Sequence, residues 1–170
     1  DPSASVTVVG SAEMQRSAAR TLDDILRRVP GFSLFRRLGS GAAHPTAQGV
    51  SLRGIGPSGT SRALVLVDGV PFNDPFGGWI SWSALPMETL ERVEVLRGAA
   101  SSLWGNYAMG GVVGVTTRRP VGNAGGIVAE GGERGLARTE AWTSRSIGNT
   151  SALVDGRWVR SGDYPLVRAD

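Results

Sequence analysis

The 170-residue sequence contains no cysteine and no lysine, and it has a single histidine. The lack of cysteine excludes disulfide scaffolds, cysteine-based zinc sites and thiol catalysis. All 18 basic residues are therefore arginine, and guanidinium groups suit bidentate pairing with carboxylates. A genome-wide bias toward arginine codons explains the same composition equally well. The 15 acidic residues are spread along the chain without a long basic block, so the charge of +3 does not indicate a nucleic-acid partner.

The sequence also has few groups that could perform catalysis. His44 lies alone in the glycine-rich segment 37–49, and no serine stands in a G-x-S-x-G context. The acidic pair Asp23 and Asp24 is expected at the start of a helix. The pair Glu91 and Glu94 is interleaved with arginine, which favours neutralised ion pairs over acids with raised pKa values. We expect no enzyme, no cofactor and no metal site.

The length allows one domain, or one domain and a fragment of another. The chain begins at Asp1 without a basic and apolar leader, which is expected of a mature or trimmed fragment. The uncharged segment 98–117 is long enough to span a bilayer, but glycine, serine and threonine interrupt it. A short helix, a turn and a buried strand explain these residues better than a transmembrane helix.

The clearest helix prediction covers residues 21–29, because Leu22, Ile25, Leu26 and Val29 form one apolar stripe. Thr21 is the expected N-cap, and the spacing favours ion pairs from Asp23 to Arg27 and from Asp24 to Arg28. Pro30 and Gly31 end the helix.

Several strands follow from β-branched and apolar runs. They are residues 6–9, the continuously apolar 63–67, which is expected to be buried on both faces, and 91–97, which carries charges on both sides. Residues 54–59 match the dinucleotide pattern G-x-G-x-x-G. Pro57 lies inside that loop and a strand follows it, so a nucleotide site is not predicted.

The segment 75–82 contains Phe76, Trp79 and Trp82 together with two glycines and no charge. Exposed aromatic side chains beside flexible glycines suggest a binding surface. Packing of the same side chains under the loop or against a surrounding wall is an equally good interpretation.

After residue 120 the pattern changes to strands at 127–131, 136–147 and 151–160. In the last strand Ala152, Val154, Gly156 and Trp158 alternate with more polar positions, as in a transmembrane barrel strand. A soluble sheet could show the same alternation.

Four segments together resemble the plug domain of TonB-dependent receptors. They are TLDDILRRVPGF at 21–32, VSLRGIG at 50–56, RALVLVDGVPFND at 62–74, and LPMETLERVEVLRGAASSLWGNYAMGGVVGVTT at 85–117. The resemblance covers roughly residues 6–119, and four motifs in the expected order are far more specific than any one of them.

The resemblance implies an α+β fold, with a small mixed β-sheet plug and short helices over residues 1–120. Antiparallel strands at 121–170 would begin a truncated outer-membrane barrel. The implied function is the gate of a TonB-dependent active transporter in the outer membrane, which admits a scarce ligand such as a metal chelate. Its implied partners are its own β-barrel and TonB, through an upstream box missing from this chain. The ligand stays open among ferric siderophores, haem, cobalamin, saccharides and nickel complexes.

Site residues also follow from the resemblance. Arg53 and Arg97, each followed by glycine, would lock the plug to acidic groups on the barrel wall, with Glu91 and Glu94 in the same region. The alternative is that both arginines pair with Glu91 and Glu94 inside the plug. Loops carrying His44, Phe76, Trp79 and Trp82 would face the ligand.

Two functions from other classes remain as alternatives. One is a free-standing periplasmic or secreted ligand-binding domain, in which the strands after residue 120 complete a soluble sheet. The other is an arginine-rich nucleic-acid binder, which would lose affinity steeply with salt. An enzyme ranks last.

Overall fold

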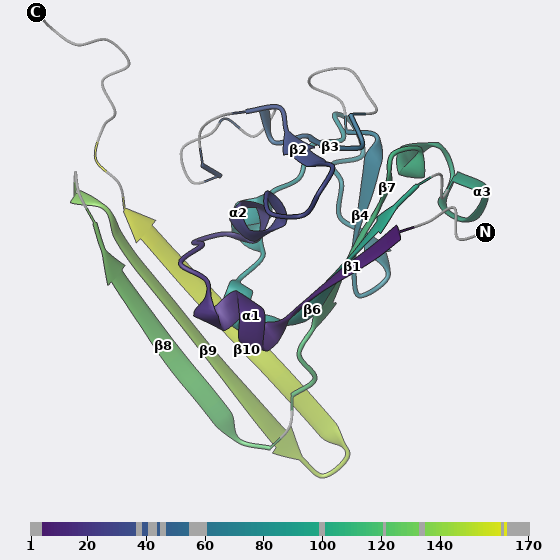
Figure 1. Ribbon diagram of the computed structural model, residues 1–170. Coiled ribbons are helices and arrows are strands. Elements are labelled where there is room, and N and C mark those ends of the chain that lie inside the picture. Colours follow the sequence, from purple (N-terminus) through teal and green to yellow (C-terminus); the bar gives the residue numbers. More distant parts are fainter. Residues whose placement is uncertain are drawn as a thin grey trace, which may run out of the picture. The chain divides into compact units, whose positions relative to one another are not determined.

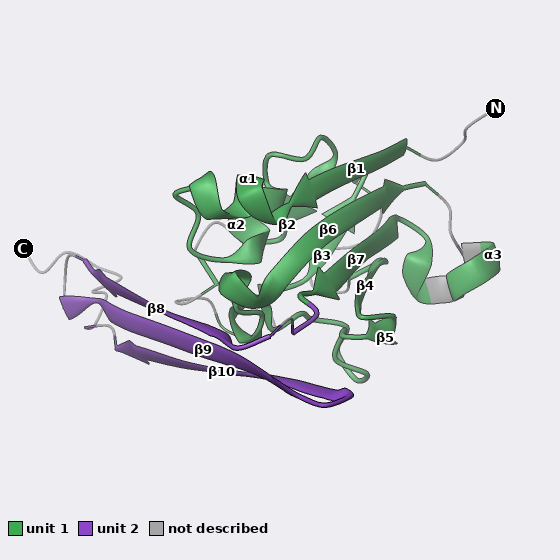
Figure 2. Ribbon diagram, turned by 90° about the horizontal axis from the view of Figure 1, so that it is seen from below, with its two compact units in different colours: residues 1–118 green, residues 119–170 purple. Residues whose placement is uncertain are grey.

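The structure is a computed structural model that describes residues 5–36, 39–40, 44, 47–54, 61–98, 101–120, 122–132, 135–160 and 162. The chain divides into two compact units, Asp1–Arg118 and Arg119–Asp170, which are coloured separately in Figure 2. The division lies two residues before the boundary expected from the sequence. Most of the G-x-G-x-x-G segment, residues 55–59, falls outside the described residues.

Unit 1 contains a five-stranded mixed sheet in the order β1-β6-β7-β4-β5. Its strands are β1 (Ser5–Gly10), β4 (Ala63–Val67), β5 (Val70–Pro71), β6 (Leu90–Arg97) and β7 (Gly111–Thr117). Only the neighbours β4 and β7 run parallel, and the other pairs are antiparallel. A separate two-stranded sheet pairs β2 (Phe32–Leu34) with β3 (Val50–Leu52).

The helices of unit 1 are short. Those whose bounds lie within the described ranges are α1 (Ser11–Arg16), α2 (Leu22–Leu26), α3 (Ser101–Trp104) and the 3-10 turns η2 (Trp82–Ala84), η3 (Met87–Thr89) and η4 (Asn106–Ala108). Helices α1 and α2 lie on one side of the sheet, and α3 lies beyond its end (Figure 1). No helix in the described ranges is long and apolar enough to cross a membrane.

Helix α2 is shorter than the predicted 21–29. After Leu26 the chain tightens, because Arg28 N donates to Ile25 O and Val29 N donates to Leu26 O in three-residue steps before Pro30. The predicted pair of Asp23 with Arg27 is wrong. Arg27 lies 4.0 Å from Asp24, while Asp23 is fully buried and pairs with Arg36.

The core of unit 1 covers both faces of the sheet, as expected for the apolar run 63–67. One cluster joins α1 and α2 to the sheet residues Ala63, Val65, Val93, Val95, Val113 and Val115. The opposite face carries Leu64, Leu66 and Val112 and is covered by Ala108 of η4. Alternate residues of β4 therefore enter different cores, which explains why the strand reads as continuously apolar.

Unit 2 is a three-stranded antiparallel sheet in the order β10-β9-β8. Its strands are β8 (Ala124–Gly131), β9 (Ala137–Ile147) and β10 (Thr150–Arg160). The register places Val154 and Trp158 opposite Thr143 and Thr139 on one face. The other face carries the ion pairs of Arg138 with Glu130 and Glu140, and of Arg157 with Glu140. One face of the sheet therefore carries Val154 and Trp158 among threonines, and the other carries the clustered ion pairs.

Candidate ligand loop and plug arginines

Residues 72–80 form what we call the aromatic loop, and Asn73 fastens it to strand β4. The Asn73 side-chain oxygen accepts a hydrogen bond from Val65 N at 2.7 Å, and its amide nitrogen donates to Ala63 O at 3.1 Å. The same nitrogen donates across the loop to Gly78 O at 3.3 Å. The Asn73 side chain thereby satisfies two backbone groups of β4 that a neighbouring strand would otherwise pair with. It also fixes the point at which the loop leaves the sheet.

Asp74 shapes the tip of the aromatic loop. Its Oδ1 accepts hydrogen bonds from Phe76 N at 2.9 Å and Gly77 N at 2.7 Å, and its backbone exchanges hydrogen bonds with Trp79 O and Gly78 N. This tight turn leaves the Phe76 side chain outside, with 96% of the residue exposed. The turn therefore presents an aromatic ring on a hydrogen-bonded scaffold.

Trp79 lies half-buried against the same loop. A Cβ atom on Gly77 would fall 1.6 Å from Trp79 Cζ3, so the indole ring occupies the space that any larger residue at 77 would need. The indole ring of Trp79 can therefore occupy this position only if residue 77 is glycine.

Trp82 differs from the expectation that it faces a ligand. It is fully buried, and its ring meets Phe32 edge to face with centroids 6.2 Å apart. The 3-10 turn η2 places it in the core beside α2. Burying the large indole surface of Trp82 is more favourable than leaving it in contact with water, so Trp82 belongs to the core.

Arg97 bonds within unit 1. Its Nη1 donates to Pro30 O at 3.0 Å, and its Nη2 donates to Ser5 Oγ at 2.7 Å and Thr7 Oγ1 at 3.1 Å. The guanidinium thus ties the start of β1 to the Pro30–Gly31 turn. In the described ranges it forms no ion pair with an acid.

Arg53 meets the same turn from the other side. Its backbone N donates to Gly31 O at 2.7 Å, and the residue adopts a left-handed φ of 61°. The residue is exposed, and among the residues that the structure describes its guanidinium has no acidic partner. The two motif arginines therefore converge on one turn, with Arg53 directed outward.

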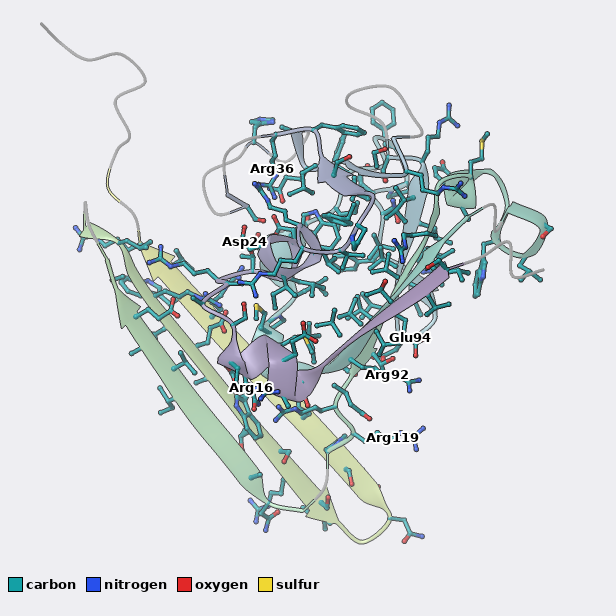
Figure 3. The ribbon with its side chains drawn as sticks, viewed as in Figure 1. Arg16, Asp24, Arg36, Arg92, Glu94 and Arg119 are labelled. Atoms are coloured by element: carbon teal, nitrogen blue, oxygen red, sulfur yellow. The ribbon has the colours of Figure 1, made fainter. Side chains whose placement is uncertain are left out.

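The acids considered as partners lie elsewhere. Glu94 pairs with Arg92 of its own strand at 3.4 Å (Figure 3), and Glu91 is exposed. Neither forms an ion pair with Arg53 or Arg97 in the described part of the chain. His44 is exposed, as expected for a loop residue. No group of three or more metal-binding side chains occurs among the described residues.

A buried polar cluster was not predicted from the sequence. Asp23 Oδ2 accepts a hydrogen bond from Arg36 at 2.5 Å, and Asp23 Oδ1 accepts one from Ser40 Oγ at 2.5 Å. Arg36 also donates to Ser40 Oγ at 2.8 Å, and Gln48 donates to Ser40 O at 3.4 Å. All four side chains are almost inaccessible to solvent. The only available signal was an acid beside the apolar stripe of α2, which does not reveal its partner.

The sequence of this chain matches a known protein family. The model of the TonB-dependent receptor plug domain matches residues 1–112. The chain belongs to the TonB-dependent receptor plug family. The fold agrees with the one that the sequence motifs implied, a mixed sheet with short helices followed by antiparallel strands.

Named relatives are transporters and receptors. The chain is 34% identical to the vitamin B12 transporter BtuB of Vibrio vulnificus over 153 residues, covering 90% of this chain and 23% of that protein. The siderophore receptor PirA of Pseudomonas aeruginosa matches 93% of the chain with a TM-score of 0.64 and 26% identity, and the chain covers 29% of that structure. PirA of Acinetobacter baumannii matches with a TM-score of 0.65 and 25% identity, over 91% of this plug chain and 24% of that one. The chain thus spans about a quarter of the length of these relatives.

Proposed function

We propose that this chain is the gate of a TonB-dependent active transporter in the outer membrane. Unit 1 is the plug, and the strands of unit 2 begin the barrel of the same receptor. The observation that carries the proposal is the aromatic loop, which presents Phe76 to solvent on a turn fixed by Asn73 and Asp74. A turn held by hydrogen bonds loses little conformational freedom when a ligand binds, and the aromatic ring on it offers a flat apolar contact surface.

The ligand classes that fit the loop share a flat or apolar face. Residues 75–82 carry no charge, and Asp74 Oδ1 already accepts two backbone N–H groups. A cobalamin or an aromatic metal chelate could lie against Phe76 and Trp79, and the named relatives include a vitamin B12 transporter and siderophore receptors. Those names also favour a transport gate over a free-standing binding domain.

The strands of unit 2 support the barrel assignment. Transmembrane barrel strands alternate between apolar residues facing lipid and polar residues facing the lumen. The placement of Val154 and Trp158 on one face, and of the ion pairs of Arg138, Glu140 and Arg157 on the other, is in keeping with this division. Gating would not need covalent chemistry: ligand binding shifts the population of plug states, and TonB, pulling on the upstream box, remodels the plug.

Removing the exposed ring tests the proposal. Phe76→Ala in the receptor that carries this chain is expected to weaken binding of vitamin B12 or ferric enterobactin, whichever the receptor takes, by about tenfold. The melting temperature should not change, because the ring is exposed. Equilibrium binding to the purified receptor measures the effect, and Val70→Ala, at a position 65% exposed, is the matched control. Unchanged affinity for a bound ligand would contradict the role of the loop.

We further propose that Arg53 locks the plug to the barrel wall. Its guanidinium has no acidic partner in the described ranges, whereas Glu130 and Glu140 of unit 2 are already paired with Arg138. The Arg97 guanidinium donates three hydrogen bonds inside unit 1. It is therefore a weaker candidate than Arg53 for a contact with the barrel wall.

Charge reversal at Arg53 is expected to loosen the plug, because repulsion would replace an ion pair with the wall. Limited proteolysis of the receptor should cut unit 1 faster in Arg53→Glu than in Arg53→Lys. Both variants keep a long side chain at a site of left-handed φ, so backbone strain is matched. Equal cleavage of the two variants would rule out the lock.

A further inference from the structure

The buried cluster of Asp23, Arg36, Ser40 and Gln48 connects helix α2 to the aromatic loop. Gln48 donates from its side chain to Ser40 O, and its own backbone oxygen accepts a hydrogen bond from Ile80 N at 3.2 Å. Ile80 ends the aromatic loop and is fully buried. A continuous series of hydrogen bonds therefore runs from the carboxylate of Asp23 to the base of the loop that carries Phe76.

The position of Asp23 is fixed because helix α2 is packed into the main core. Leu22, Ile25 and Leu26 of the same helix are buried in the main core, in the cluster that also contains Ile80. The Arg36 side chain is 4% exposed and that of Asp23 is 0% exposed. Water cannot substitute for either partner at this depth, so Arg36, Ser40 and Gln48 keep their positions only while the cluster is complete.

We propose that Asp23 is a positioning residue for the ligand loop. Through Ser40 and Gln48 it fixes the backbone oxygen to which Ile80 N, at the end of the aromatic loop, donates. The ligand-binding part of this inference rests on the proposed function. The coupling between the cluster and the loop does not, because it concerns hydrogen bonds within unit 1.

The alternative is that the cluster only adds to the stability of unit 1. Breaking a buried ion pair destabilises the whole unit, so a loss of stability alone would not distinguish the two roles. A positioning role predicts an additional local change in the residues that the hydrogen bonds reach.

Amide hydrogen exchange of the full chain separates these roles without a ligand. In Asp23→Asn the amides of Gly78 and Ile80, which donate to Asp74 O and Gln48 O, are expected to exchange about tenfold faster, as for the loss of roughly one hydrogen bond. Amides in β6 and β7 should accelerate only by the factor that the measured loss of stability of unit 1 accounts for. Asp24→Asn is the matched control, since Asp24 is the next residue of α2 and its ion pair with Arg27 is partly exposed.

Two further variants keep the test decisive. Ser40→Ala removes one hydroxyl and leaves the ion pair, so it should fold even if Asp23→Asn does not, and it should show the same local acceleration. Asp23→Leu with Arg36→Met replaces the ion pair by apolar side chains and should recover stability without restoring slow exchange in the aromatic loop.

The outcomes are distinct. Exchange that accelerates more in the aromatic loop than in β6 and β7 supports the positioning role. Exchange that rises equally across the sheet, that stays unchanged in Ser40→Ala, or that recovers together with stability in the apolar double variant would overturn it. Failure of the receptor to bind vitamin B12 or ferric enterobactin would count against the proposed ligands, and would leave the result of the exchange experiment intact.

Discussion

Trp82→Ala is expected to destabilise unit 1 by roughly 3–5 kcal/mol, the usual cost of deleting a buried aromatic side chain. Trp82 has no exposed surface, and its ring packs against Phe32 in the cluster that joins α2 to the sheet. A domain of this size is stable by about 5–15 kcal/mol, so the variant loses a large part of that free energy. Denaturant unfolding of the full chain, followed by circular dichroism, measures the change.

Two controls define the cause. Trp82→Phe should cost much less, because it keeps a ring and removes the indole N–H, which is buried and has no hydrogen-bond partner among the described residues. Trp158→Ala, at a position 56% exposed in β10, should leave the unfolding of unit 1 unchanged. If Trp82→Ala were as stable as the wild type, Trp82 would have to lie on the surface.

Gly111→Ala is the second substitution with a large expected effect. An added Cβ would fall 2.2 Å from Leu96 O and 2.9 Å from Leu52 Cδ1, and the backbone at Gly111 has a φ of 138° that only glycine adopts readily. Steric overlap and backbone strain together predict a loss of roughly 2–5 kcal/mol. The midpoint of chemical unfolding reports it.

Gly114→Ala provides the matched control on the same strand. Its Cβ would meet only Glu94 O, at an ordinary contact distance of 3.9 Å. We expect a change of less than about 1 kcal/mol there, the scale of the intrinsic preference between glycine and alanine. Similar losses of stability for the two variants would show that the close approach of β6 to β7 is not the reason why glycine is needed at position 111.

The sequence was sufficient for the elements whose residues carry a local signal. The continuously apolar run at 63–67 predicts β4, and the alternation at 151–160 predicts β10. Helix α2 was found from its apolar stripe, although its length was overestimated because the turn before Pro30 tightens after Leu26. Four motifs in order were enough to indicate the family that the comparison shows.

Interactions between distant segments could not be read in the same way. Asp23 was expected to pair along its own helix, but a loop thirteen residues later supplies Arg36 and buries both charges. The local pattern places Trp82 with the exposed aromatic residues, because it does not distinguish a ring that turns into the core from one that turns toward solvent. The outcome for both residues depends on tertiary packing, which single-sequence patterns do not contain.

The most direct test of the account is protection of position 76 by ligand. The chain has no cysteine, so Phe76→Cys introduces the only thiol in these 170 residues. In the receptor, vitamin B12 or ferric enterobactin is predicted to slow maleimide labelling of this thiol by about tenfold or more, while labelling of Val70→Cys stays unchanged. If a ligand binds the receptor with ordinary affinity and both thiols still react at the same rates as without it, the aromatic loop does not face the ligand and the proposed gate is contradicted.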